Sequence, residues 1–527
     1  MKNQSRAKAE SRSVFNFIPQ NFLKLLLVII GLNFLFNLLL FDPKLFTGGD
    51  NAVYISLAES IASGNGYKDI FDPDNPPHTQ YPFGLPLLLT PIVYVWGHNY
   101  ILMKLLIIFI GLGLIYFLGR LLQQISTWEI TLFVVLLTAL NPYIIEYSHW
   151  ILTEIPYLFF SILGIYLLER ALNSQNRGLV YLIAGAGAIV YSYFIRPTGL
   201  ALIAAGFLIL LIKKRYKYAL IYSAVILICV FPWFYRNARI GEVLGLSQKM
   251  LMMRSVYNME SGTMTFSELI NRVLANLRIY SFTIIPQSIF YNIPEHDLGK
   301  LLLALILILP WLLGFGHQII KKFSLSHLYF LSYFLIVLPW HEYVSTERYF
   351  LPVLPLFLYF VANGLITISN KLKISKSWLL GPYLVVISFI SVFNIVKMAP
   401  TQLNNLILYL KGDKYAGYSP DWVRFFEAVE WIKANTPENS VVISRKPPFV
   451  YLVAHRKGKV YPFTFDREKV KSFLFDSKAK YILVDHFYWT GTTPKYLIPV
   501  LQEYPDKYEI LFISKPPETL VLKTKSD

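Results

Sequence analysis

Residues 21–41 read NFLKLLLVIIGLNFLFNLLLF, an apolar run in which Lys24 is the single charged side chain. A helix needs about 20 apolar residues to cross the hydrocarbon core of a bilayer, whereas the apolar part of a signal peptide has about 7–15. Asp42-Pro43 follows the run, and no small-residue cleavage site is present. We therefore expect an uncleaved first membrane span, preceded by a basic cytoplasmic N-terminus at residues 1–20.

The whole chain has a similar character. Of its 527 residues, 55% are hydrophobic and only 15% are charged, whereas soluble domains have about 25% charged residues. Most of the chain must therefore face lipid. The net charge of +17 would also suit a nucleic-acid-binding protein. However, the basic residues lie mainly between the apolar runs, so we expect a lipid bilayer as partner and no nucleic acid.

Ten further apolar runs predict membrane spans, which makes the chain a mainly α, polytopic helical membrane protein with about eleven spans. They lie at about 100–121, 127–145, 151–169, 178–195, 198–212, 218–235, 300–320, 326–341, 349–369 and 378–397. Lysine and arginine gather in alternate loops, as expected for cytoplasmic loops. An odd number of spans then places the C-terminus outside.

The chain divides into a transmembrane domain at 21–399 and a soluble, extracytoplasmic α/β domain at 400–527. Two long outer loops, 42–98 and 239–299, interrupt the first domain, and loops of this length are usually functional. Within the first loop, 52–63 has the spacing of an amphipathic helix on the membrane, and 83–97 predicts a re-entrant or interfacial segment. In the tail, the pattern predicts helices at 420–435, 466–477 and 494–503 and strands at 441–444, 481–485, 509–513 and 519–522. We find no catalytic motif there.

Two acidic residues are candidates for chemistry. Asp50 follows two glycines in Thr47-Gly48-Gly49-Asp50-Asn51, where a carboxylate at the membrane face could act as a general base or bind a metal. The alternative is that Asp50 caps the helix at 52–63. Glu154 begins an apolar span, a costly position that indicates function, unless its carboxylate extends to the interface. Both residues are expected at the outer face.

Four cations lie near the outer ends of spans, against the general trend of the charges: Lys104, Arg196, Arg236 and Arg348. An anion such as a lipid phosphate would explain them through charge-assisted hydrogen bonds. The alternatives are contact with lipid headgroups, or ion pairing, for example of Arg348 with Glu342 or Glu347. Tyr81, in the segment Tyr81-Pro82-Phe83-Gly84-Leu85-Pro86, and His149 are candidates for a cavity on the same side. Each could instead be an ordinary interfacial or solvated residue.

These motifs together resemble a known family. Gly49-Asp50 after the first span, a YPxGxP-like segment at 81–86, Glu154, IRP at 195–197, PWxxRN at 232–237 and RYxLPxLP at 348–355 occur in this order. Residues 20–400 are therefore similar to the GT-C superfamily of polytopic glycosyltransferases, and in particular to the bacterial branch that contains protein mannosyltransferases and aminoarabinose transferases.

The resemblance implies transfer of a hexose or pentose from a polyprenyl-phosphate donor to a glycan, lipid or protein acceptor, on the extracytoplasmic face of a membrane that we expect to be the bacterial inner (plasma) membrane. It assigns the catalytic carboxylate to Asp50 and the second acid to Glu154. The first loop reads Gly-Asp-Asn rather than carrying two acids, so no cofactor is certain. A divalent metal such as Mg²⁺ or Mn²⁺, held by Asp50 and Glu154, stays open.

The residues suit this chemistry. A lipid phosphate leaves as a stable anion, so no strong general acid is needed, in contrast to glycoside hydrolysis. One base on the acceptor hydroxyl, Asp50, and cations on the leaving phosphate suffice. Arg236 and Arg348 would hold that phosphate, assisted by Lys104 and Arg196, and direct attack on the sugar C1 implies inversion. The alternative is a transporter or flippase of lipid-linked sugars, which would not need Asp50 as a base.

Overall fold

The computed structural model describes residues 21–174, 176–241, 251–255, 259–342, 345–475, 479–487, 489 and 491–525. The predicted cytoplasmic N-terminus, 1–20, and parts of the second outer loop lie outside these residues. The chain forms two compact units. Unit 1 comprises residues up to Asp42, Lys104–Arg236 and Ser267–Asn404, and unit 2 comprises Pro43–Met103, Asn237–Phe266 and Asn405–Asp527. Unit 2 thus combines the first outer loop with the soluble tail.

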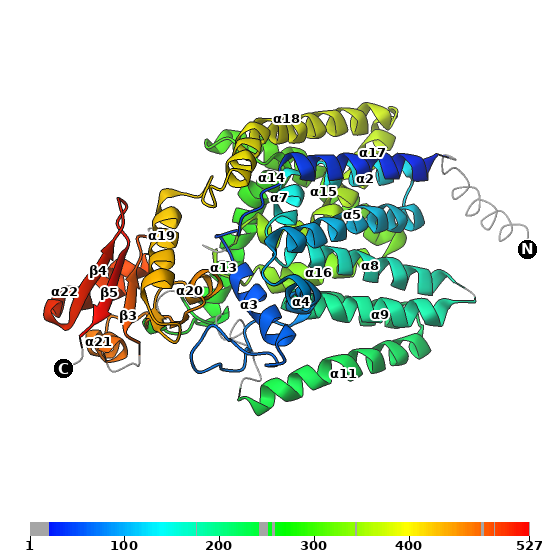
Figure 1. The fold of residues 1–527 in the computed structure, drawn as a ribbon. Helices are drawn as coiled ribbons and strands as arrows, with labels where there is room; N and C mark the ends of the chain where they lie inside the picture. The colour runs from blue at the N-terminus through cyan, green and yellow to red at the C-terminus, as the bar shows by residue number, and fades with distance from the viewer. Residues whose placement is uncertain are drawn as a thin grey trace, which may run out of the picture. The chain divides into compact units, whose positions relative to one another are not determined.

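Unit 1 is helical, and Figure 1 shows its long helices lying roughly parallel, with α8 packed along α9. Some of its helices extend past the unit boundary. The helices are α2 (Phe22–Leu39), α5 (Tyr100–Ile125), α6 (Trp128–Ala139), α7 (Pro142–Ser148), α8 (Glu154–Asn173), α9 (Gly178–Ile195), α10 (Leu200–Ile212), α11 (Tyr216–Arg239), α13 (Phe266–Ile279), α14 (Ile285–Phe290), α15 (Asp297–Lys322), α16 (Leu325–Val337), α17 (Leu354–Leu372) and α18 (Ser377–Leu410). Short 3-10 turns η1 (Pro197–Gly199), η5 (Glu347–Tyr349) and η6 (Leu351–Val353) and the π-helical turn η3 (Tyr280–Ile284) connect them.

Each of the eleven predicted spans is helical. Among the described residues, eight helices are long and apolar enough to cross a membrane. The predicted span 127–145 is a pair, α6 and α7, bent by 53°, which would be a ninth. Two predicted spans, 198–212 and 326–341, correspond to α10 and α16, which have 13 residues each. At 1.5 Å per residue these two are about 20 Å long, shorter than the hydrocarbon core.

The close packing of α15 against α17 depends on two glycines. A Cβ at Gly314 would overlap the carbonyl oxygen of Phe360, and one at Gly364 would overlap the backbone of Pro310. Without side chains at these positions the two helix backbones approach directly, the usual role of small residues between membrane helices. Hydrophobic side chains of α17, including Phe357 and Phe360, are almost fully buried beside this crossing.

Unit 2 contains the first outer loop as a folded segment. The predicted helix at 52–63 is α3 (Asn51–Ala62), and the predicted segment 83–97 contains α4 (Gly84–Trp96), a 13-residue apolar helix. Helix α3 packs against α4 and against α20 (Pro447–Ala454) of the tail. Its side chains are buried on more than one face, so α3 is an internal helix of unit 2. This burial differs from the predicted one-sided, membrane-lying helix.

The tail forms a mixed sheet with strand order β2-β1-β3-β5-β4. Strand β1 (Val441–Ile443) is parallel to both β2 (Lys457–Lys459) and β3 (Tyr481–Val484). Strand β5 (Leu520–Thr524) is antiparallel to β3 and to β4 (Tyr508–Ile513). The helices of the tail are α19 (Pro420–Asn435), α20, α21 (Arg467–Phe475) and α22 (Ile498–Glu503), with turns η7 (Thr493–Leu497) and η8 (Pro505–Lys507). The second outer loop adds the turn η2 (Met259–Ser261) to unit 2. Figure 1 shows this sheet in orange and red.

The predicted α/β tail is therefore confirmed, including α19 from Pro420 and the strands β1, β3, β4 and β5. Two elements were not predicted, α20 and β2. Helix α18 also continues through Pro400 to Leu410, beyond the expected domain boundary. Buried apolar residues from β1, β3, β5, α21 and η7 form one core of the sheet, for example Ile443, Ile482, Leu522, Val470 and Leu497.

Candidate functional site

In unit 1 a buried carboxylate holds two arginines together. Glu154 begins α8, and Arg196 directly follows α9, so the antiparallel packing of these helices brings the two side chains side by side. Arg196 Nη1 donates to Glu154 Oε1 over 3.0 Å. Arg348, in η5, donates from Nε to the same oxygen. The structure thus brings together three of the predicted site residues, from positions 42 and 194 residues apart.

This cluster carries a net positive charge, one carboxylate against two guanidinium groups. Glu154 is 1% exposed, and its Oε2 has no hydrogen-bond partner among the described residues. The guanidinium of Arg196 is buried and lies over the ring of Tyr349 at 5.4 Å. The side chain of Arg348 is 22% exposed, so it is the member of the cluster that a ligand can reach. The suggestion that Glu154 extends to the membrane interface is wrong, because its carboxylate is enclosed.

Two further acids lie near this cluster and were not predicted as site residues. Tyr147 donates to Glu347 over 3.1 Å, and Tyr291 donates to Glu146 over 2.9 Å. Glu347 had been considered only as an ion-pair partner of Arg348. Glu146 lies inside an apolar segment of sequence, and this position of an acid is the signal that could have identified it.

The remaining predicted cations of unit 1 lie outside this cluster. Lys104 is 1% exposed and donates from Nζ to the backbone oxygen of Asp42 over 2.6 Å. His149 lies close enough to Lys104 to interact with it electrostatically, and its ring is buried against Phe41. The alternative of a solvated His149 is therefore wrong. Arg236, near the end of α11, lies over the ring of Trp233 at 5.0 Å and is half-buried.

Asp50 occupies the N-cap position of α3 in unit 2, but its side chain makes no capping hydrogen bond. Asp50 therefore has the position of a cap, as the capping alternative expects, but its carboxylate does not act as one. The turn before it is tight, because a Cβ at Gly48 would come within 2.8 Å of the ring of Phe46. Asp50 is half-buried, and it interacts electrostatically with Lys446 of the tail, within the same unit.

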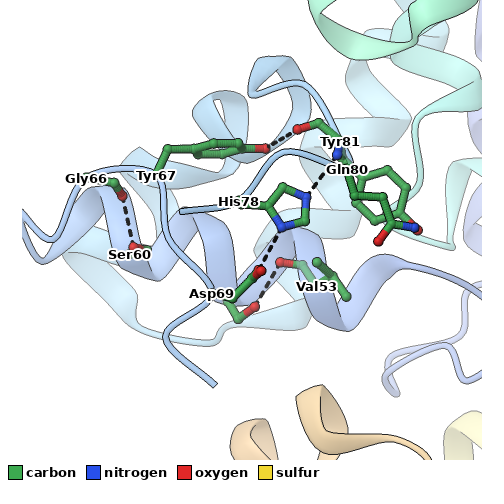
Figure 2. Close-up of polar contacts among 9 residues, drawn as sticks. Val53, Ser60, Gly66, Tyr67, Asp69, His78, Gln80 and Tyr81 are labelled. Carbon is green, nitrogen blue, oxygen red and sulfur yellow. Dashed lines mark hydrogen bonds and ion pairs between the residues drawn. The ribbon is translucent and has the colours of Figure 1, made fainter. Parts of the chain in front are cut away.

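Tyr81 is held near the first turn of α3 by a network that Figure 2 shows. The backbone N–H of Tyr81 donates to His78 Nε2 over 2.9 Å, and His78 Nδ1 lies 2.7 Å from Asp69 Oδ1. Because Nε2 accepts, the proton of the neutral ring is on Nδ1 and points to Asp69. Tyr67 donates from its hydroxyl to the backbone oxygen of Tyr81, and the Tyr81 ring packs edge-on against Tyr54. His78 is thus a buried structural residue and is not solvated.

The donor set does not fit a metal at Glu154. Among the described residues, no group of three or more His, Cys, Asp or Glu side chains could hold a metal ion. Glu154 Oε1 already accepts from two guanidinium groups, and their positive charge opposes a cation at the same carboxylate.

A cavity of about 870 Å³ opens at the far end of α8 from Glu154. It is lined by basic side chains, among them Arg120, Arg170, Lys213 and Lys322. These residues belong to the loops predicted as cytoplasmic, so their charge follows the general rule for such loops. The cavity contains none of the predicted site residues.

No protein-family model matches the chain, and no curated protein matches it. Among solved structures, the chain is similar to ArnT from Cupriavidus metallidurans in the apo state, with a TM-score of 0.60 and 11% identity over 94% of this chain and 97% of that one. The same protein bound to undecaprenyl phosphate gives a TM-score of 0.60 and 11% identity over 95% and 98%.

The chain is also similar to the oligosaccharyltransferase AglB from Archaeoglobus fulgidus, in complex with an inhibitory peptide and a dolichol-phosphate. Here the TM-score is 0.54, with 14% identity over 96% of this chain and 75% of that one. At such low identity the likeness concerns the fold, and it extends over nearly the whole chain. The protein is therefore a polytopic helical membrane protein with the GT-C fold.

Proposed function

We propose that the protein is a membrane glycosyltransferase that moves a sugar from a polyprenyl-phosphate donor to an acceptor hydroxyl on the extracytoplasmic face, with inversion at C1. The solved structures that share the fold include ArnT bound to undecaprenyl phosphate and AglB in complex with a dolichol-phosphate. A lipid phosphate as a ligand of this chain agrees with both. The distribution of charge between the loops supports a tail on the outer side, and transfer on that face of a bacterial inner membrane is part of the proposal.

The observation that carries the proposal is the attachment of Arg348 to a buried carboxylate. Glu154 holds the guanidinium through its Nε, so this side chain needs little further ordering when an anion binds. Arg196 supplies a second positive charge behind the same carboxylate. In this proposal Arg348 binds the leaving phosphate, Glu154 is a positioning residue, and Arg236 is a second phosphate ligand. Lys104 and Arg196 add positive charge from buried positions.

Asp50 is the general base of the proposed reaction. Its carboxylate takes the proton of the acceptor hydroxyl while the acceptor oxygen forms a bond to the sugar C1. The bond from C1 to the phosphate oxygen breaks at the same time, and the electron pair leaves with the polyprenyl phosphate. Cations that bind this phosphate stabilise the charge that develops on it. The helix does not use the Asp50 side chain as a cap, so the role of a base does not compete with capping of α3.

A transfer assay with the purified full chain tests the proposal. Liposomes would contain the protein, a radiolabelled undecaprenyl-phosphate sugar and a membrane extract as the acceptor pool. Asp50→Asn is expected to lower transfer by at least about 100-fold, the range for loss of a general base. Asp74→Asn is a matched control, because it removes an acid from the same loop. The exposed carboxylate of Asp74 forms an ion pair with Lys459 of the tail, which has small energetic value.

Two results would contradict the proposal. Full transfer by a normally folded Asp50→Asn protein would remove the base. Passage of the intact labelled donor across the liposome membrane, equally fast in both variants and without a transfer product, would identify a transporter of lipid-linked sugars instead.

A further inference from the structure

The strand order of the unit 2 sheet reverses between β1 and β3, and ligands of open α/β sheets bind at such a place. Strands β1 and β3 are parallel neighbours. Strand β1 leads through α20 to β2, which pairs with β1 on the side away from β3. Strand β3 leads away from β1 through η7 and α22. Helix α20 packs with α19, whereas η7 and α22 pack with α21. The connections after β1 and β3 thus depart in opposite directions, and ligands of open α/β sheets bind at the carboxyl ends of such strands.

Two cations lie directly after β1, at this edge. Arg445 donates from Nε to Thr492 Oγ1 over 3.0 Å, and its guanidinium lies over the ring of Phe463 at 4.7 Å. Lys446 Nζ lies 4.9 Å from the ring centre of Trp489, and that ring is 55% exposed. Both cations are therefore held against aromatic faces, and neither forms an ion pair with a carboxylate in this part of the described chain.

Two buried side-chain oxygens at the same edge have no hydrogen-bond partner among the described residues. Asp485 follows β3 and is 3% exposed. Its Oδ1 accepts from the backbone N–H of Phe487 and from the hydroxyl of Thr493. Its Oδ2, and the hydroxyl of the fully buried Ser444 after β1, have no hydrogen-bond partner among the described residues. Such groups are costly unless something binds them, and the hydroxyl groups of a ligand would satisfy both.

Asp50 also lies near this edge. Lys446 interacts electrostatically with both Asp50 and Asp485. All three residues belong to unit 2, and α20, which Lys446 precedes, packs directly against α3, which Asp50 precedes. A ligand at the carboxyl edge of β1 and β3 would therefore lie beside the carboxylate that we propose as the base.

We propose that this edge is the acceptor subsite, and that its ligand is an anionic saccharide. Arg445 and Lys446 bind its carboxylate or phosphate group, Trp489 stacks on a sugar ring, and Asp485 accepts a sugar hydroxyl. This combination selects a saccharide because exposed aromatic rings, a carboxylate acceptor and paired cations suit the apolar face, the hydroxyls and the charge of one ligand. The acceptor role rests on the proposed function, whereas the binding of the saccharide does not.

Binding can be measured without turnover, by calorimetry on the full-length protein in detergent. The probes are tetragalacturonic acid, the neutral maltotetraose of equal length, and inorganic phosphate. We expect tetragalacturonic acid to bind at least tenfold more tightly than either of the others. The double variant Arg445→Gln/Lys446→Gln should lose at least tenfold in affinity. The control Lys469→Gln/Lys471→Gln removes two cations from α21 that form exposed ion pairs, and it should bind within about twofold of the parent.

The pH dependence of binding gives an independent test, because it can be measured on the unmodified protein and does not depend on the folding of a variant. Burial, followed by the positive charge of Arg445, lowers the pKa of Lys446 to about 8, although Asp50 and Asp485 oppose this. Affinity for tetragalacturonic acid should therefore fall as the pH rises from 7 to 9, when Lys446 loses its charge. Lys446→Arg keeps the charge over this range and should bind with a nearly constant affinity.

The outcomes separate the two proposals. Equal binding of the acidic and neutral tetrasaccharides, equal losses in both double variants, or binding of phosphate as tight as that of the saccharide would each overturn the subsite. Tight, charge-selective binding in a protein that transfers no sugar would keep the site and overturn the transferase. If transfer occurs, Arg445→Gln/Lys446→Gln should raise the acceptor KM at least tenfold and leave the donor KM unchanged. An unchanged acceptor KM would overturn the subsite alone.

Discussion

Arg196 donates from Nη1 to Oε1 of Glu154 over 3.0 Å, and both side chains are almost fully buried. With Arg348 on the same oxygen, the cluster is an Arg–Glu–Arg triad inside the helical unit. Replacing a whole buried ion pair by apolar residues is often neutral for stability, whereas removing one partner leaves an uncompensated charge. The carboxylate is the member whose loss is least tolerable, since two guanidinium groups would then face each other.

Glu154→Gln should therefore lower the free energy of unfolding by about 3–5 kcal/mol, measured by thermal or denaturant unfolding in detergent. Glu347→Gln is a suitable comparison, because this half-buried acid accepts one hydrogen bond, from Tyr147, and its replacement should cost about 1 kcal/mol. Adding Arg196→Gln to Glu154→Gln should recover part of the loss, since one of the two opposed charges is removed. A Glu154→Gln protein as stable as the parent would contradict the triad.

Gly314→Ala should destabilise unit 1 by about 1–3 kcal/mol, the usual cost of overpacking. The new methyl group would overlap the backbone of α17 at Phe360, so the two helices would have to separate. Gly316→Ala lies two residues away on the same helix, and a Cβ there meets nothing within 4 Å. This control should be neutral or up to about 1 kcal/mol more stable, since alanine favours helix over glycine. Equal melting temperatures for the two variants would contradict the close crossing.

The helices of unit 1 could be predicted because a long apolar run has few other stable structures in a membrane chain. The elements α20 and β2 could not. Helix α20 starts with Pro447-Pro448, and β2 reads Lys457-Gly458-Lys459, a pattern without the alternation or β-branched residues of a typical strand. It becomes a strand because β1 offers it a parallel edge, a tertiary effect that no local pattern reports.

The sequence indicated several residues of the candidate site, but it did not indicate which of them contact one another. Charge at the outer ends of spans identified Glu154 as a candidate acid and placed Arg196 and Arg348 among four candidate cations. It did not indicate that these two cations hold the carboxylate. Arg445 and Lys446 gave no signal, because two basic residues in a polar tail usually belong to a solvated surface. Only the strand order brings them to one edge with Asp485.

His78→Leu should disturb the segment that carries Tyr81. The change removes the acceptor of the Tyr81 backbone N–H and the partner of Asp69, and leaving buried polar groups unpaired costs about 1–3 kcal/mol. We expect a lower melting temperature and lower transfer activity. Gln80→Ala removes only the half-buried hydrogen bond to the Tyr81 hydroxyl and should change the melting temperature little. The network of Figure 2 would be disproved if both variants melted alike.

Acid should loosen the contact between the first outer loop and the tail, because two groups there change charge in the same direction. Glu59 Oε1 accepts from the hydroxyl of Tyr451 over 3.1 Å, and Oε2 lies 3.0 Å from His98 Nε2. Burial raises the pKa of Glu59, but the hydrogen bond with His98 and then that from Tyr451 bring it below the usual 4.5. Burial lowers the pKa of His455, which stacks with His98, below 6.5.

The direction in which stability changes with pH depends on whether the folded or the unfolded chain binds protons more readily. The unfolded chain protonates His455 from pH 6.5 downwards and Glu59 from pH 4.5 downwards, in both cases before the folded chain does. The two groups therefore stabilise the folded contact fully above pH 6.5. As the pH falls, the contribution of His455 is lost first and that of Glu59 second. Hydrogen exchange of peptides from α3 and α20 should speed up between pH 6.5 and 4, after correction for intrinsic rates. His455→Gln should remove the upper part of the change and Glu59→Gln the lower part. As a control, Asp466→Asn disrupts an exposed ion pair with Lys469 and should leave the pH profile of hydrogen exchange unchanged. If Glu59→Gln also left this profile unchanged, the Glu59 carboxylate would not hold the loop.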